Sequence, residues 1–116
     1  FITGAPFACD IQGRDAVFAG FKKSLDGFDR KFGRRDWRCG EILVSPPNLI
    51  KGTVVSTYEM DGKPPLQFGV QAIWGFTDDR ISLMVDLYDI SRIDAINSLE
   101  WLEDYGLEYD LDASYV

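Results

Sequence analysis

Two side chains near the end of a predicted strand are the best candidates for chemistry. Asp86 and Tyr88 occur in the run Asp86-Leu87-Tyr88-Asp89, so the carboxyl and phenol groups point to the same face of an extended chain. A carboxylate held among apolar side chains has a raised pKa, which suits it to proton transfer. The chain contains no histidine. Ser-His-Asp and Cys-His catalysis are therefore excluded, and a zinc site lacks its commonest ligand.

Aromatic and apolar residues on neighbouring predicted strands could surround Asp86. Alternation along 66–77 and 80–88 gives each strand one side rich in large side chains. Tyr58 and Tyr88 could supply hydrogen bonds to a bound polar group. We therefore expect a ligand pocket lined by Trp37, Phe68, Ala72, Trp74, Met84, Asp86 and Tyr88, with Asp86 and Tyr58 as candidate catalytic groups.

Each of these residues also has a purely structural interpretation. Asp86 could bind backbone amides or pair with Arg38, and in that case it would do no chemistry. Trp37 and Trp74 could stack on a flat ligand, or they could be core residues that need no ligand. The sequence leaves both interpretations open.

Length and charge limit the classes of partner. The chain has 116 residues, 46% of them hydrophobic, which is enough for one domain with a core. The net charge of −7 is concentrated in residues 89–116, where Arg92 is the only basic residue. Because an acidic end repels phosphate backbones, we expect no nucleic-acid partner. No run approaches the roughly 20 apolar residues of a membrane span, so we expect no membrane partner.

The two cysteines indicate a cytoplasmic protein. Cys9 and Cys39 have no second pair at metal-ligand spacing, and we interpret both as free thiols. The first residues show no signal-peptide pattern. We expect neither a metal nor a cofactor.

The elements follow from a change of hydrophobic period. A helix is expected over 14–26, where the spacing of Val17, Phe18, Phe21 and Leu25 predicts a core-facing side. The period then changes to two, which predicts strands over 36–44, 48–60, 66–77 and 80–88 in an antiparallel meander. A second helix is expected over 91–105, followed by an acidic, loosely held tail over 107–116. The whole chain, 1–116, is expected to form one domain, with the sheet and first helix in 1–90.

Three motifs follow one another along the chain: Gly13-Arg14-Asp15-Ala16-Val17 opening a helix, the hairpin Asp61-Gly62-Lys63, and Arg80-Ile81 leading to Leu87-Tyr88-Asp89. In their order and spacing they resemble the SnoaL-like, nuclear-transport-factor-like superfamily, and among its members the limonene epoxide hydrolases. The resemblance covers residues 3–89. It implies an α+β fold in which a curved antiparallel sheet forms a cone-shaped barrel and helices cover its concave face. It also implies assembly into homodimers or higher oligomers.

The catalytic residues of these relatives are mostly replaced in this chain. Asp86 matches the last-strand aspartate of the epoxide hydrolases, but the positions expected for its arginine and aspartate partners fall near Gly52–Val55. The positions expected for the water-holding tyrosine and asparagine fall near Thr3 and Ala5. Relatives also carry one or two helices before the segment that begins here. We expect the helix near 91–105 to cover the concave face in their place.

Two functions are therefore considered. The first is a binding domain that holds a small apolar or aromatic molecule in an aromatic-lined pocket. The second is an acid–base enzyme of the hydrolase, isomerase or dehydratase type, with Asp86 as proton carrier and a tyrosine as helper. A second polar group within about 3–5 Å of Asp86 inside the cavity would favour the enzyme, because proton transfer needs hydrogen-bond reach. We favour binding, because most groups used by the enzymatic relatives are missing.

Overall fold

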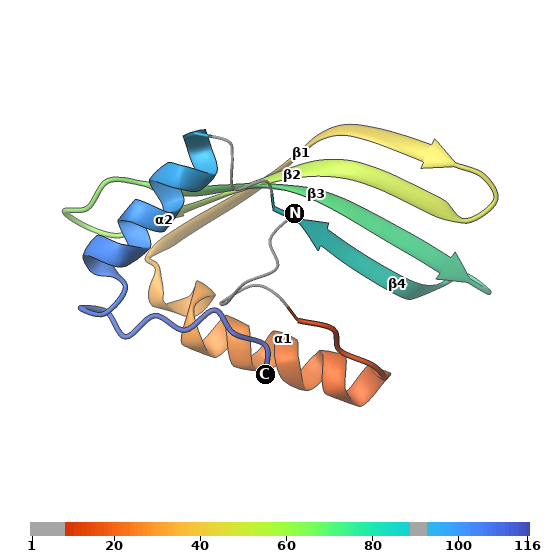
Figure 1. Cartoon of the computed structure of the whole chain (residues 1–116), viewed down its shortest axis with the longest axis horizontal. Helices are drawn as coiled ribbons and strands as arrows, with labels where there is room; N and C mark the ends of the chain where they lie inside the picture. Colours follow the sequence, from red (N-terminus) through yellow and green to blue (C-terminus); the bar gives the residue numbers. More distant parts are fainter. Residues whose placement is uncertain (1–8, 89–92) are drawn as a thin grey trace.

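The structure is a computed structural model that describes residues 9–88 and 93–116. In chain order the elements are α1 (Arg14–Gly27), the short 3-10 helix η1 (Asp29–Lys31), β1 (Arg34–Ser45), β2 (Leu49–Glu59), β3 (Leu66–Thr77), β4 (Arg80–Leu87) and α2 (Ile93–Tyr105) (Figure 1). The predicted α+β class is confirmed, and the four strands begin and end within two residues of the predicted positions. Thr3, Ala5 and Asp89 lie outside the described residues.

The four strands form one antiparallel sheet in the order β1-β2-β3-β4. The hairpin between β3 and β4 turns at Asp78 and Asp79, whose φ angles of 50° and 61° are typical of a two-residue turn that follows the strand twist. The sheet is curved and does not close, so β1 and β4 are open edges. A register shift between Cys39 and Ile42 marks a bulge in β1, and a second shift lies in the pairing of β3 with β4.

The core lies at one end of one face of the sheet, here called the inner face. Phe28 and Phe32, which follow α1, pack on Tyr58 with ring centroids 5.2 and 5.0 Å apart. Leu66 is fully buried beneath them, and Trp101 of α2 completes the cluster. Because Tyr58 pairs with Leu66 across β2 and β3, the register places both side chains on this face.

The helix α2 runs beside the first half of β3, the part that β4 does not pair with. The hydroxyl of Ser98 donates to the carbonyl oxygen of Gln67, and the indole nitrogen of Trp101 donates to the carbonyl oxygen of Pro64 at 2.7 Å. These bonds satisfy backbone groups along the edge of the sheet, and they fix α2 against the core end of the sheet.

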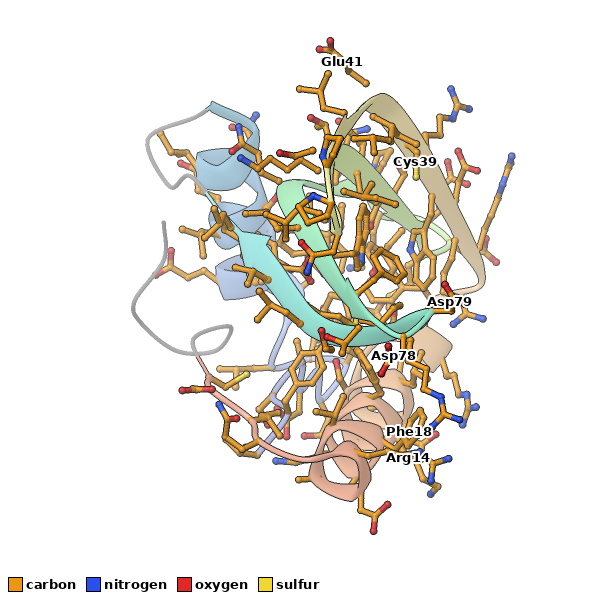
Figure 2. All side chains as sticks on the ribbon, turned by 90° about the vertical axis from the view of Figure 1, so that its right-hand side faces the viewer. Arg14, Phe18, Cys39, Glu41, Asp78 and Asp79 are labelled. Carbon is orange, nitrogen blue, oxygen red and sulfur yellow. The ribbon has the colours of Figure 1, made fainter. Side chains whose placement is uncertain are left out.

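The predicted core-facing side of α1 is only partly buried. Val17, Phe21 and Leu25 are half-buried, but Phe18 is 56% exposed and its ring stacks under the Arg14 guanidinium, 5.1 Å away (Figure 2). The expectation that all four residues pack into the core is therefore wrong for Phe18. The buried positions of α1 are instead its small residues Gly20 and Ser24.

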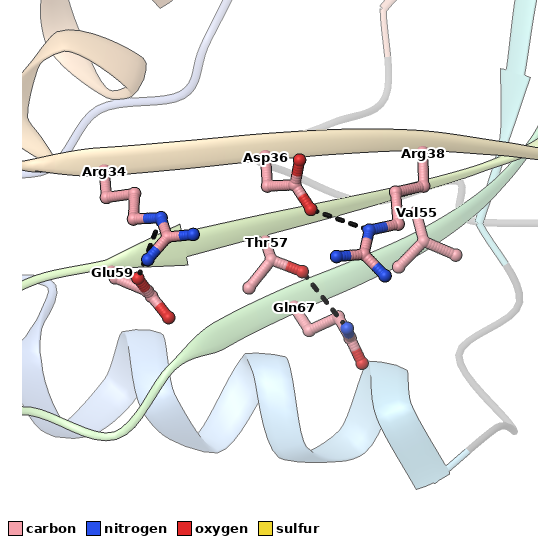
Figure 3. Close-up of a pocket in the computed structure, with 7 residues that line it drawn as sticks. All are labelled: Arg34, Asp36, Arg38, Val55, Thr57, Glu59 and Gln67. Atoms are coloured by element: carbon pink, nitrogen blue, oxygen red, sulfur yellow. Dashed lines mark hydrogen bonds and ion pairs between the residues drawn. The ribbon is translucent and has the colours of Figure 1, made fainter.

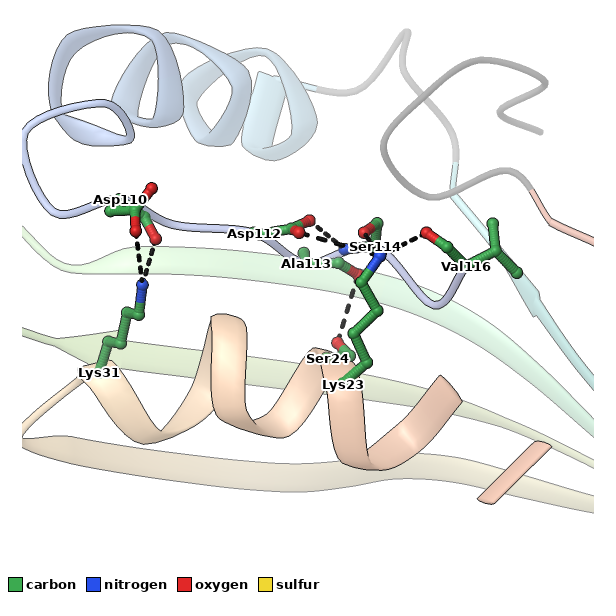
Figure 4. Close-up of polar contacts among 8 residues, drawn as sticks. All are labelled: Lys23, Ser24, Lys31, Asp110, Asp112, Ala113, Ser114 and Val116. Carbon is green, nitrogen blue, oxygen red and sulfur yellow. Dashed lines mark hydrogen bonds and ion pairs between the residues drawn. The ribbon is translucent and has the colours of Figure 1, made fainter. Parts of the chain in front are cut away.

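The small residues of α1 form a track for the C-terminal tail, so the prediction of a loosely held tail is also wrong. The amide of Asp112 donates to the carbonyl oxygen of Gly27 at 2.9 Å. The hydroxyl of Ser24 donates to the carbonyl oxygen of Ala113 at 3.2 Å (Figure 4). Lys23 donates to the hydroxyl of Ser114 at 2.8 Å. The tail lies close to α1 because no side chain intervenes at Gly20 or Gly27.

Candidate functional site

The inner face beyond the core is an apolar surface formed by all four strands. The register places Val44, Ile50, Trp74 and Met84 opposite one another in a single row across the sheet. Val44 and Met84 are exposed, whereas Ile50 and Trp74 are half-buried. The neighbouring row adds Ile42. We call these five residues the inner patch: Ile42, Val44, Ile50, Trp74 and Met84.

Asp86 lies at the end of the row that contains Ile42. Across this row Ile42 pairs with Gly52, Gly52 with Ala72, and Ala72 with Asp86. The Trp74 ring reaches over Gly52, where an added Cβ would lie 3.4 Å from the ring, and Ala72 is buried. Asp86 therefore lies one row from Trp74 and Met84 on the same face, as the alternation in the sequence predicts.

The carboxylate of Asp86 is exposed to solvent, yet the surrounding protein removes part of its hydration and raises its pKa. No hydrogen bond or ion pair joins Asp86 to another residue within 9–88 or 93–116. A carboxylate in this condition is available to a bound molecule, either to pair with a cation or to exchange a proton.

Phenol groups lie near this carboxylate. Burial raises the pKa of Tyr88, and the charge of Asp86 raises it further. Burial likewise raises the pKa of Tyr115, which packs edge-on against Phe21 at 5.7 Å and also responds to Asp86. Tyr115 was not predicted as a site residue, because nothing in the sequence indicates that the tail returns to the sheet.

The other predicted pocket residues are divided between the core and the surface. Phe68 belongs to the edge of the core cluster, with its ring 6.2 Å from those of Phe28 and Tyr58. Ala72 is buried, and Trp37 is exposed on the inner face opposite Ser56. The structure thus brings Ala72, Trp74, Met84, Asp86 and Tyr88 together, whereas Trp37, Tyr58 and Phe68 lie nearer the core end of the sheet.

Sequence reasoning missed Ile42, Val44 and Ile50. A signal was present in Gly40-Glu41, because a glycine inside a strand often marks a bulge. The bulge changes the alternation of β1, so Trp37 and Ile42 point to the same face although one number is odd and the other even.

Arg38 does not pair with Asp86, although the sequence allowed this pairing. Its guanidinium lies on the outer face and bonds to Asp36 at 2.8 Å, so it does not pair with Asp86. A hollow of about 240 Å³ lies on this outer face (Figure 3). It is lined by Arg34, Asp36, Arg38, Val55, Thr57, Glu59 and Gln67.

The polar groups of the outer hollow contact one another. Arg34 lies 3.6 Å from the carboxylate of Glu59, and Gln67 donates to the hydroxyl of Thr57 at 3.1 Å. Two arginines are balanced by two carboxylates, so the hollow has no net charge to attract an ion. A second hollow, of about 520 Å³, lies beside the turn between β2 and β3 and includes none of the predicted site residues.

Tyr58 has a structural partner. Its hydroxyl donates to the carboxylate of Asp29 at 3.0 Å, and both groups are buried. Burial and the Asp29 charge raise the pKa of Tyr58, so the phenol stays protonated at neutral pH. This hydroxyl therefore secures a buried carboxylate at the core end of the sheet.

We expect Tyr58→Phe to lower the free energy of unfolding by about 1–2 kcal/mol, because the buried Asp29 carboxylate loses its hydrogen bond. Urea unfolding followed by circular dichroism measures the change. Tyr109→Phe is the matched control, since it removes a phenol hydroxyl from a half-buried tyrosine in the tail. Equal losses of unfolding free energy in the two variants would show that the Tyr58–Asp29 bond contributes no more to stability than the hydroxyl of Tyr109.

Compared with known protein families, curated proteins and solved structures, the chain matches none. Among the described residues, no three cysteine, aspartate or glutamate side chains are grouped so that they could hold a metal ion. None of the described helices has the length and apolar character needed to cross a membrane.

Proposed function

We propose that the protein binds a small apolar or aromatic molecule on the inner patch, with Asp86 and Tyr88 at the polar end of the site. The observation that carries this proposal is a shared apolar face, on which exposed side chains of β1 and β4 lie beside half-buried side chains of β2 and β3. Exposed apolar surface has an unfavourable free energy of about 25 cal/mol per Å² relative to burial, so an occupant of this surface is stabilised by covering it. A contiguous exposed apolar surface is typical of binding sites.

The proposal extends the resemblance to the SnoaL-like superfamily. In this view the inner face is the wall of a cone-shaped fold, α1 and α2 cover part of it, and the inner patch is the part left for a ligand. The Trp74 ring packs over Gly52 and offers a flat, half-buried contact surface. These features suit a molecule with an apolar body.

Two contacts favour binding over acid–base catalysis. Proton transfer needs a partner within hydrogen-bond reach of the carboxylate. Of the helpers considered for Asp86, Arg38 is bonded to Asp36 on the opposite face, and the Tyr58 hydroxyl is bonded to Asp29. Of the candidate helpers, Tyr88 lies near Asp86, and its phenol is protonated at neutral pH and able to donate a hydrogen bond.

Binding can be tested with a neutral fluorescent probe, N-phenyl-1-naphthylamine, whose emission rises in an apolar environment. We expect saturable binding, and we expect Ile42→Ala to raise the Kd about five- to thirtyfold, because about 1–2 kcal/mol of apolar contact is lost. Leu43→Ala is the matched control, since Leu43 is the next residue, points to the outer face and is equally exposed, 57% against 55% for Ile42.

The two variants distinguish binding of the probe at the inner patch from nonspecific binding to any exposed apolar side chain. Both remove a branched aliphatic side chain of the same size from the same strand. A rise in Kd for Ile42→Ala alone supports the proposal. Absence of saturable binding, or equal effects of the two substitutions, would contradict it.

A further inference from the structure

Among the described residues, Asp86 places a negative charge at the inner patch. This charge raises the pKa of the phenols of Tyr88 and Tyr115. None of these groups can supply a positive charge. The whole chain has a net charge of −7, so the surrounding field also favours a cation over an anion.

The basic side chains of the inner face and of α1 either lie far from Asp86 or contact other groups. Arg35 is on the inner face, but it pairs with Tyr58 at the core end, three rows from Asp86, which is on the order of 20 Å along the strands. On α1, Arg14 stacks on Phe18, Lys22 pairs with Asp26, and Lys23 bonds to the tail. The carboxylate of Asp86 therefore has no cation of the described chain beside it.

We infer that the ligand is an amphipathic amine, a molecule with an ammonium group on an apolar body. This inference rests on the proposed function. The ammonium group would pair with Asp86, and the hydrocarbon would cover Trp74, Met84 and Ile42. The row spacing supports this arrangement, since Asp86 lies at the end of one row and Trp74 in the next. An ammonium group near Trp74 also gains attraction from the face of the indole ring.

Three eight-carbon molecules test the inference, because they share one chain and differ in charge at neutral pH: octylamine, octanol and octanoate. Binding is measured by NMR titration of the wild-type protein. We expect octylamine to bind about fivefold more tightly than octanol, as one partly exposed ion pair allows, and octanoate to bind most weakly. In Asp86→Asn the affinity for octylamine should fall to that for octanol, and the affinity for octanol should stay unchanged.

Asp79→Asn is the control for net charge. It removes one carboxylate from the turn between β3 and β4, at the far end of β4 from Asp86, and asparagine readily adopts the positive φ of this position. This variant should keep the preference for octylamine. Equal affinities for octylamine and octanol in the wild type, or a preference that persists in Asp86→Asn, would overturn the inference while leaving apolar binding in place. Failure of all three molecules to bind would instead contradict the proposed function itself.

Discussion

Trp101→Ala is expected to lower the free energy of unfolding by about 3–5 kcal/mol, the usual loss when a buried tryptophan is truncated. The Trp101 ring packs 5.7 Å from Phe32 and 5.1 Å from Tyr105, and only 5% of the residue is exposed. The substitution also removes the hydrogen bond to the carbonyl of Pro64. Because small domains have a total stability of about 5–15 kcal/mol, this loss would shift the urea midpoint strongly. Circular dichroism at increasing urea concentration measures it.

Trp37→Ala is the matched control, because it deletes the same side chain from an exposed position on the inner face. We expect it to change the stability by about 0.5–1 kcal/mol or less. A similar loss in both variants would mean that α2 does not close the core. A large loss in Trp101→Ala alone supports the placement of α2 beside β3.

Gly27→Ala is expected to destabilise the protein by about 3 kcal/mol, at the upper end of the usual cost of overpacking. An added Cβ at Gly27 would lie 2.4 Å from the backbone oxygen of Asp112, so the tail must move. Moving it breaks the bond from the Asp112 amide to Gly27 and exposes Ala113, which is buried. Thermal unfolding measures the loss, and hydrogen exchange should show faster exchange at the amide of Asp112.

Gly33→Ala is the control for this substitution. An added Cβ there would meet only the carbonyl oxygen of Glu59, at 3.9 Å, which is an ordinary contact. We expect little change in stability from Gly33→Ala. If Gly27→Ala were as stable as the wild type and kept slow exchange at Asp112, the tail would not be docked on α1 as described.

The strands were predictable because each carries its own period-two pattern and is bounded by turn residues. Asp78 and Asp79 indicate the last hairpin from sequence alone, and both adopt the positive φ that such a turn needs. The docking of the tail could not be predicted in this way. It depends on backbone-to-backbone approach at Gly20 and Gly27, and a small residue in a helix gives no periodic signal.

The candidate site was predictable only where alternation is unbroken. Trp74, Met84 and Asp86 belong to paired stretches of β3 and β4, so their shared face follows from the sequence. The contribution of β1 could not be assigned, because the bulge after Cys39 changes which residues face inward. The partner of Tyr58 is Asp29, which lies far away in the sequence, and such a long-range contact leaves no local pattern. Arg38 bonds to Asp36, two residues earlier on the same face of β1, so the bulge after Cys39 does not affect this contact.

The inner patch can be tested most directly by locating a bound octyl chain through intermolecular nuclear Overhauser effects in the labelled protein. We expect contacts from the octyl protons to the Trp74 indole, the Met84 methyl group and the methyl groups of Ile42. Contacts to Leu43 and Val55 without any to Trp74 or Ile42 would place the ligand on the outer face and contradict binding at the inner patch.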